Sequence, residues 1–130
     1  MRKSILLPAL FLMSMLFMAT KCEENNDTIE SDRLKLSELK TEIDTLVEAS
    51  VCGDAYSCAF IAYGSKACGG PQGYLVYTNS IDVEHLKVLI ENYNEAEAYF
   101  NKKWDIVSNC MMPSPPTNLI CENNKCVAVF

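Results

Sequence analysis

Two stretches of the chain place apolar residues at spacings of three and four, which puts them on one face of an α-helix. The first stretch covers residues 31–51, where Ser31 or Asp32 can cap the start and Gly53 follows the end. Its other face carries Lys, Glu, Asp and Thr, so we expect one buried side and one solvated side. The apolar positions are Leu36, Leu39, Ile43, Leu46 and Val47.

The second stretch is longer and covers residues 82–107. Asp82 is a favourable helix cap, and Ile81 before it can pack on Leu86 as a hydrophobic staple. The stripe has a single break, at Glu97. We interpret its aromatic members as core residues rather than as a cofactor site. The apolar positions are Val83, Leu86, Ile90, Tyr93, Phe100, Trp104 and Val107.

Between and after these helices the pattern changes to short strand-like runs. Residues 58–63 and 74–77 flank a 64–73 loop that holds four glycines and a proline, a composition that excludes a helix or a strand interior. The last two runs, 119–122 and 125–129, flank an Asn-Asn pair that tolerates the positive φ of a two-residue hairpin turn. This register places Cys121 opposite Cys126, and Glu122 opposite Lys125.

The elements together predict an α+β fold, in which two helices pack on a small, mostly antiparallel sheet of three or four strands. We expect a single domain over residues 31–130, preceded by a flexible acidic tether at residues 22–30. A domain of about 100 residues buries only a modest core. Disulfides that each contribute about 2–4 kcal/mol would offset that.

The amino end has the pattern of an export signal. A short basic start is followed by an almost wholly apolar run over residues 5–18, and then by acidic and amide residues. The apolar run is shorter than the roughly 20 residues that a membrane-spanning helix needs. The sequence therefore predicts a signal peptide at residues 1–21 and an exported mature chain.

Cys22 directly follows the signal and resembles the lipidation site of bacterial lipoproteins, whose cysteine is acylated and becomes the first residue. The family usually has Gly, Ala or Ser before this cysteine, where this chain has Lys21. We expect a lipoprotein anchored in the outer membrane or at the cell surface. Plain secretion and a retained signal anchor are the alternatives.

The cysteine count supports this interpretation. An exported chain with seven cysteines leaves one thiol over, and Cys22 lies far from the rest. In an oxidising compartment we expect the other six to form disulfides, with a connectivity that the sequence leaves open. These six are Cys52, Cys58, Cys68, Cys110, Cys121 and Cys126.

Charge and residue spacing narrow the range of functions. The mature chain would keep eight basic and 17 acidic residues, a net charge of −9, which argues against a nucleic-acid partner. The cysteines lack the close pairs of a zinc site, and His85 is the single histidine. No nucleophile–base–orienting set is evident either. We therefore expect no metal, no cofactor and no enzymatic activity.

The 64–73 loop is the stretch that suggests a function beyond scaffolding. Its glycines, Gly69 and Gly70 among them, let a partner approach the backbone closely, and Lys66 is its only charge. A basic residue on a disulfide-braced loop is how several unrelated inhibitors of trypsin-like proteases bind their targets. In the alternative interpretation Lys66 is a solvated turn residue and the glycines only shape the connection.

The run Gly64-Ser65-Lys66-Ala67-Cys68-Gly69-Gly70-Pro71, together with the cysteines and prolines that follow, resembles small exported bacterial cysteine-rich proteins and lipoproteins. The resemblance covers roughly residues 52–130 and implies no particular activity. We expect a small non-catalytic module that binds another envelope or extracellular protein. The alternatives are a protease inhibitor that uses Lys66 and a structural envelope protein.

Overall fold

A computed structural model describes residues 27–130 of the chain. The expected signal peptide at residues 1–21 and the expected lipidation site at Cys22 lie outside the described residues, as do residues 23–26 of the expected tether.

Helix α2 spans Ile29–Glu48. It begins two residues before the predicted start, because Thr28 rather than Ser31 or Asp32 is the cap. The Thr28 hydroxyl accepts a hydrogen bond from the backbone N–H of Ser31 at 3.1 Å, and the Ser31 side chain reciprocates in a capping box. The predicted tether therefore overlaps the first turn of the helix.

Helix α3 spans Val83–Lys103, and Asp82 caps it as predicted by accepting a hydrogen bond from the His85 N–H at 2.9 Å. The predicted extension to residue 107 is wrong. Asp105 adopts a left-handed conformation with φ of 47°, which ends the helix. Val107 therefore leaves the apolar stripe, and its side chain is 92 % exposed.

The strands confirm an α+β fold but form two sheets instead of one. Strands β1 (Cys58–Tyr63) and β2 (Gly73–Thr78) pair antiparallel, and so do β3 (Asn118–Glu122) and β4 (Lys125–Val129). The hairpin register is the predicted one, with Cys121 opposite Cys126. Both turn residues, Asn123 and Asn124, have positive φ, at 50° and 62°.

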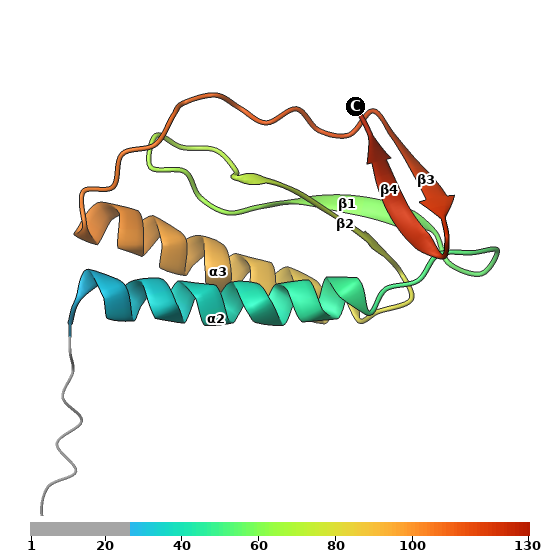
Figure 1. Ribbon diagram of the computed structural model, residues 1–130, viewed down its shortest axis with the longest axis horizontal. Helices are drawn as coiled ribbons and strands as arrows, with labels where there is room; N and C mark the ends of the chain where they lie inside the picture. The colour runs from blue at the N-terminus through green and yellow to red at the C-terminus, as the bar shows by residue number, and fades with distance from the viewer. Residues whose placement is uncertain (1–26) are drawn as a thin grey trace, which may run out of the picture.

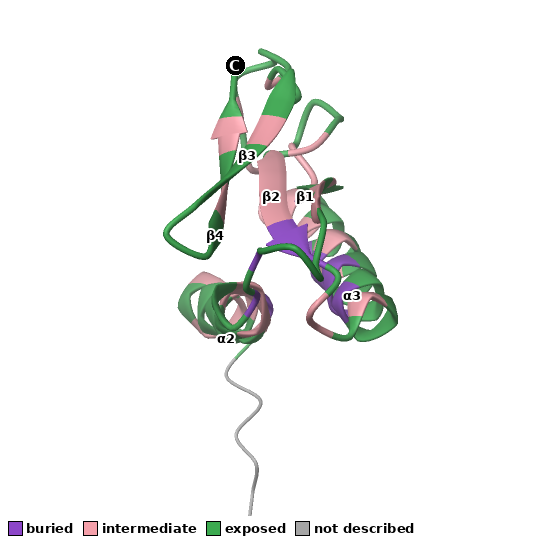
Figure 2. Ribbon diagram, turned by 90° about the vertical axis from the view of Figure 1, so that its right-hand side faces the viewer, coloured by how far each residue is buried: buried purple, intermediate pink, exposed green. Residues whose placement is uncertain are grey.

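The helices lie side by side and antiparallel beneath the β1–β2 sheet, and the β3–β4 hairpin lies on the side away from the helices (Figure 1). Alternate residues of the first sheet, among them Ala59, Ile61 and Tyr77, pack into the core with the helical stripes. The buried residues gather where this sheet meets the inner sides of α2 and α3 (Figure 2). The fully or nearly buried core consists of Ile43, Tyr77, Leu86, Leu89, Ile90 and Tyr93.

Two disulfides attach the hairpin to the chain segment that follows α2. Cys121 bonds to Cys52 and Cys126 bonds to Cys58, so neighbouring cysteines of one hairpin hold both ends of the 52–58 segment. Lys125 adds a polar contact, since its ammonium donates to the carbonyl oxygens of Glu48 and Ser50, at the C-terminal end of α2. α2 has no basic residue in its own last turn, so the hairpin supplies the positive charge that this end favours.

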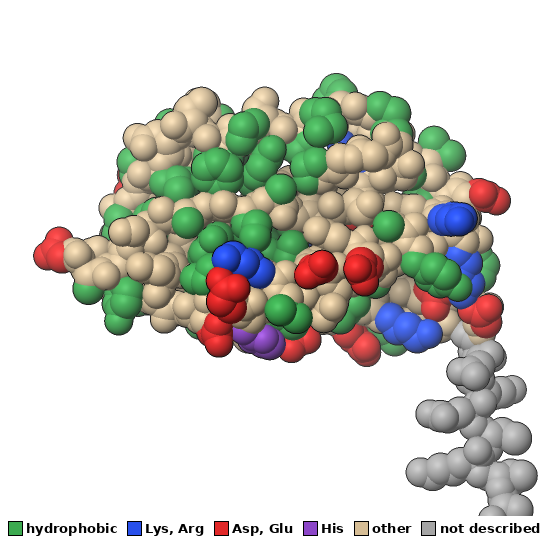
Figure 3. Space-filling model, turned by 180° about the vertical axis from the view of Figure 1, so that it is seen from behind, with side chains coloured by type: hydrophobic (Ala, Val, Ile, Leu, Met, Phe, Trp, Pro, Cys, Tyr) green, Lys and Arg blue, Asp and Glu red, His purple; other side chains and the backbone are tan. Residues whose placement is uncertain are grey.

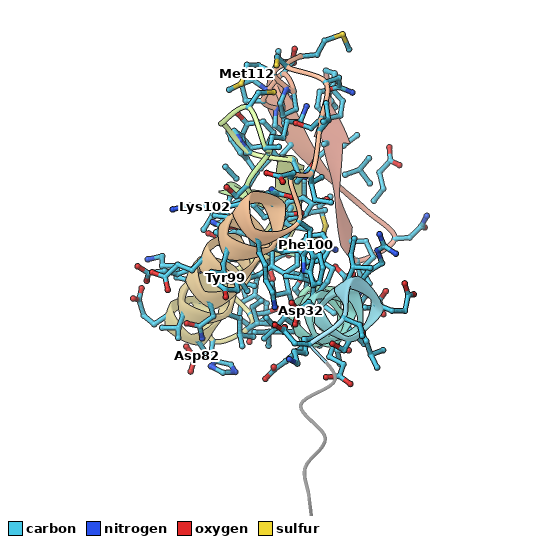
Figure 4. The ribbon with its side chains drawn as sticks, turned by 90° about the vertical axis from the view of Figure 1, so that its left-hand side faces the viewer. Asp32, Asp82, Tyr99, Phe100, Lys102 and Met112 are labelled. Atoms are coloured by element: carbon cyan, nitrogen blue, oxygen red, sulfur yellow. A yellow bond between two sulfur atoms is a disulfide. The ribbon has the colours of Figure 1, made fainter. Side chains whose placement is uncertain are left out.

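A latch joins the opposite end of the two helices. Asp32 on α2, labelled in Figure 4, accepts hydrogen bonds from the Lys103 ammonium at 2.6 Å and from the Trp104 indole at 3.1 Å. These donors, Lys103 first, lower the pKa of the Asp32 carboxyl to about 2.

In the described part of the chain, neither helix combines the length and apolarity required to cross a bilayer.

Candidate functional site

The 64–73 loop is fixed to one face of α3 by three polar side chains spaced about one turn apart. Asn94 accepts a hydrogen bond from the Gly64 N–H at 2.6 Å, and Glu97 accepts one from the Ser65 N–H at 2.5 Å. The Asn101 amide donates to the Ser65 carbonyl at 2.7 Å. The loop therefore has a defined position on the helix, and Glu97 is an anchor rather than a gap in the stripe.

Glu97 also collects two side-chain donors. The Gln72 amide and the Tyr93 hydroxyl both donate to its second oxygen, each at 3.2 Å. Burial of the Tyr93 ring and the neighbouring carboxylate of Glu97 together raise the pKa of the Tyr93 hydroxyl well above its usual value. The hydroxyl stays protonated and remains a donor. Both ends of the loop are thus held by one carboxylate.

The tip of the loop is a tight turn in which glycine is required. The Lys66 N–H donates to the Gly70 carbonyl and the Gly69 N–H donates to the Lys66 carbonyl, both at 2.9 Å. Gly69 and Gly70 have φ of 93° and 83°, a region that side chains disfavour. A Cβ on Gly70 would come within 2.6 Å of the Met112 sulfur. The close approach that Gly70 permits is therefore to the chain's own 104–117 segment, which connects α3 to β3.

Lys66 is half-buried and directed at that same segment. Its ammonium donates to the Asn109 side-chain oxygen at 2.9 Å and to the Met111 carbonyl at 2.5 Å. The 104–117 segment passes over the loop on its way to the hairpin (Figure 1). A protease inhibitor needs a basic side chain that projects into solvent, and here the ammonium is occupied by internal acceptors. The inhibitor hypothesis loses its geometric support.

Cys68 and Cys110 lie next to each other at this junction, unbonded and exposed. The Cys68 sulfur is 3.4 Å from the Ser108 hydroxyl oxygen and 3.3 Å from the Asn109 carbonyl oxygen. A hydrogen bond from Cys110, followed by the Ser108 hydroxyl, lowers the pKa of the Cys68 thiol. The same hydrogen bond raises the pKa of Cys110. Of the six cysteines expected in disulfides, four are bonded in the structure. For Cys68 and Cys110 the disulfide stays a prediction.

One group of potential metal ligands is found within residues 27–130. The sulfur atoms of Cys52, Cys58 and Cys126 lie within 4.8 Å of one another. All three belong to the two disulfides, and metal ions bind cysteine as the thiolate. The cluster is therefore the point at which two neighbouring disulfides meet.

Two of the open hollows on the described surface lie beside the loop and between the helices. One, of about 540 Å³, lies between the loop and the end of α3, next to Lys66, Asn101 and Asp105. The other, of about 650 Å³, is a shallow groove between the helices, bordered by Thr45 and Leu89 among others. His85, the single histidine of the chain, borders this second groove and not the hollow beside the loop.

Charged and exposed apolar side chains are segregated on opposite sides of the molecule. Residues 27–51 and 82–103, the helices with their flanks, carry 18 charged side chains, whereas residues 52–81 and 104–130 carry five. In contrast, nine of the 13 large apolar side chains with high exposure lie in residues 52–81 and 104–130. Figure 3 shows most of the red and blue side chains over the lower, helical part and mainly hydrophobic or uncharged atoms above.

We call the side away from the helices the apolar face. Its three regions are β1, the 104–117 segment and the β3–β4 hairpin, whose register places Ile120 opposite Val127. In Figure 4, the label of Met112 at the top of the view marks the 104–117 segment. The exposed residues of the face are Phe60, Val107, Met111, Met112, Ile120, Val127, Val129 and Phe130.

Comparisons of the chain with protein-family models, with curated proteins and with solved structures found no match.

The sequence pattern pointed to the 64–73 loop but missed the residues that hold it. Asn94, Glu97 and Asn101 are spaced by three and four on a helix, which is a signal that could have been read as a polar stripe beside the apolar one. The apolar face had no comparable signal. Its members come from distant segments, and single exposed hydrophobic residues are common on any protein.

Proposed function

We propose that the mature chain is an exported module, tethered by lipid at Cys22, that binds another exported protein through its apolar face. The observation that carries the proposal is the concentration of exposed apolar side chains on one side of an otherwise acidic domain. Val107, Met111 and Phe130 are 92 %, 75 % and 78 % exposed. Exposed apolar side chains that gather on one side of a domain are a feature of interaction sites.

The composition of the face favours a protein over a lipid or nucleic-acid surface. Binding sites for proteins are enriched in Met and aromatic residues and depleted of Lys, Glu and Asp. The two lysines on this side, Lys66 and Lys125, donate to acceptors of the chain itself, so they offer little to a phosphate group. The remaining charges are acidic: Asp54, Asp105 and Glu122.

The flexible thioethers of Met111 and Met112 suit such a contact, because methionine adapts its shape to a partner. Beneath them, the loop and its anchors hold the backbone in place, which limits the entropy lost on binding. We assign the 64–73 loop the role of supporting this surface rather than of contacting the partner through Lys66.

Charge-introducing variants on the hairpin test the proposal. Val127→Glu and Val129→Glu alter side chains that are both 38 % exposed, and Val88→Glu is the matched control on the outer side of α3, where the side chain is 54 % exposed. Each protein is immobilised with its disulfides intact and exposed to exported proteins of the source cell. Retained proteins are identified by mass spectrometry, then purified and titrated by calorimetry.

If the proposal is right, a retained protein binds the unmodified chain and Val88→Glu with the same affinity. It binds the two hairpin variants at least tenfold more weakly. Equal binding to all four chains would place the interface elsewhere and overturn the proposal. Binding of the unmodified chain to neutral phosphatidylcholine vesicles, lost in the hairpin variants, would assign the face to the membrane surface instead. Self-association lost in the same variants would make the partner a second copy.

A further inference from the structure

The Cys68 and Cys110 thiols differ from the other four described cysteines in bonding and in support. Both are unbonded, exposed and adjacent, whereas the other four form two disulfides. They come from segments 42 positions apart in the chain, the 64–73 loop and the 104–117 segment. Their proximity is therefore a product of the fold.

That proximity does not depend on a sulfur–sulfur bond. The Lys66 ammonium already ties the loop to Asn109 and Met111, and the Cys68 thiol contacts the Asn109 carbonyl at 3.3 Å. The loop itself is fixed to α3 through Asn94, Glu97 and Asn101. The two thiols thus keep their positions in the reduced protein. Forming or breaking a bond between them requires little rearrangement.

The β3–β4 hairpin has a different dependence on its disulfides. It forms a separate two-stranded sheet, and a hairpin of this size has little stability on its own. Its bonds to Cys52 and Cys58 attach it to the rest of the domain. Loss of those bonds removes structure, whereas loss of a Cys68–Cys110 bond leaves a junction that is already held by hydrogen bonds.

We propose that Cys68 and Cys110 form a thiol–disulfide exchange site, which passes between dithiol and disulfide by reaction with an organic disulfide while the other two disulfides stay intact. Cys68 is the attacking residue. Its neighbours are the Ser108 hydroxyl, which can donate to a thiolate, and the Lys66 ammonium, which adds positive charge. A thiolate in such surroundings is the reactive form of cysteine.

In the oxidising direction, the Cys68 thiolate attacks one sulfur of the incoming disulfide. That sulfur–sulfur bond breaks, one thiolate leaves and takes a proton, and a mixed disulfide to Cys68 forms. Cys110 then loses its proton, and its thiolate attacks the Cys68 sulfur and expels the second thiolate. Two cysteine thiols have lost two electrons and two protons, and the incoming disulfide has become two thiols.

Redox titration of the purified protein tests the proposal. The chain is equilibrated in buffers of graded glutathione to glutathione disulfide ratio, quenched with acid and alkylated, and each cysteine is scored by peptide mass spectrometry. Cys68 and Cys110 should change state together at a ratio where Cys52, Cys58, Cys121 and Cys126 stay bonded. Far-ultraviolet circular dichroism should be the same on both sides of that transition. Simultaneous reduction of all six cysteines would overturn the proposal, as would pairing of Cys68 with any other residue.

Single-cysteine variants test the order of attack. Cys110→Ser should accumulate a glutathione mixed disulfide on Cys68, because the resolving thiol is gone. Cys68→Ser should leave Cys110 at least tenfold slower to react. Equal rates in the two variants would contradict the assignment of Cys68 as the attacking residue. Repeating the measurement with oxidised thioredoxin as the disulfide distinguishes a protein source of oxidising equivalents from a small-molecule source.

Discussion

The sequence pattern and the structure give opposite expectations for the replacement of Glu97 by leucine. Judged by the stripe alone, Glu97→Leu completes an apolar face and should stabilise α3. In the structure, the carboxylate accepts hydrogen bonds from Ser65, Gln72 and Tyr93. The substitution removes all three and leaves the Ser65 N–H without its acceptor.

The magnitude follows from these contacts. Hydrogen bonds to a charged group contribute about 1.5–3 kcal/mol each, and we use the lower end because the site is half-buried. Burying part of a leucine side chain returns about 1–2 kcal/mol. We expect a net loss of about 3 kcal/mol in the free energy of unfolding. For a domain of this size, that corresponds to a decrease in melting temperature of roughly 12–24 °C.

The assay is urea unfolding of the oxidised protein, followed by circular dichroism, with hydrogen exchange of the loop amides as a local readout. Glu97→Leu should accelerate exchange at Gly64 and Ser65. Glu97→Gln, which keeps an acceptor, should lose about half as much stability. Glu95→Leu on the exposed side of the same turn should change stability by less than about 0.5 kcal/mol. If Glu97→Leu proves as stable as the unmodified protein, the anchoring role of the carboxylate is refuted.

Three further predictions concern other parts of the molecule. The pKa of Asp32 in the folded protein lies below its ordinary value, so its contribution to stability is present above pH 4 and is lost as the pH falls towards 2. Asp32→Asn should flatten this part of the plot of unfolding free energy against pH. Parallel plots for the variant and the unmodified protein would contradict the latch. Lys125→Met should lower the free energy of unfolding by about 1 kcal/mol through loss of the charge at the end of α2, and Lys125→Arg, which keeps the charge, is the control in the same urea titration. Mass spectrometry of the envelope fraction should find a mature chain that begins at an acylated Cys22, and a lipid-free chain with a different first residue would contradict lipidation.

Local patterns in the sequence predicted the local elements well. The 3.6-residue periodicity located both helices, and the Asn-Asn pair predicted the hairpin and its register, because these features depend on neighbours within a few residues. The end of α3 was predicted too far along, since the apolar residue Val107 continues the period after the backbone has turned at Asp105.

Long-range contacts were the part that the sequence could not supply. The strands form two sheets joined by disulfides, and the cysteine pairing spans 68 and 69 positions. The environment of Lys66 depends on Asn109 and Met111, which are 43 and 45 residues away. In the sequence alone, an isolated charge on a glycine-rich loop looks like a solvent-exposed recognition residue, because its hydrogen-bond acceptors lie in a distant segment.

The bond between Cys52 and Cys121 also determines how the protein would carry a mechanical load. If a partner pulls on β3 while lipid holds the amino end, tension passes from Cys121 to Cys52 and then along α2 to Asp27. The disulfide bypasses the 68 residues between its two cysteines. The core strands, α3 and the 64–73 loop therefore lie outside the stretched path. A chain tethered in this way could unfold α2 under force and still remain bound to the partner.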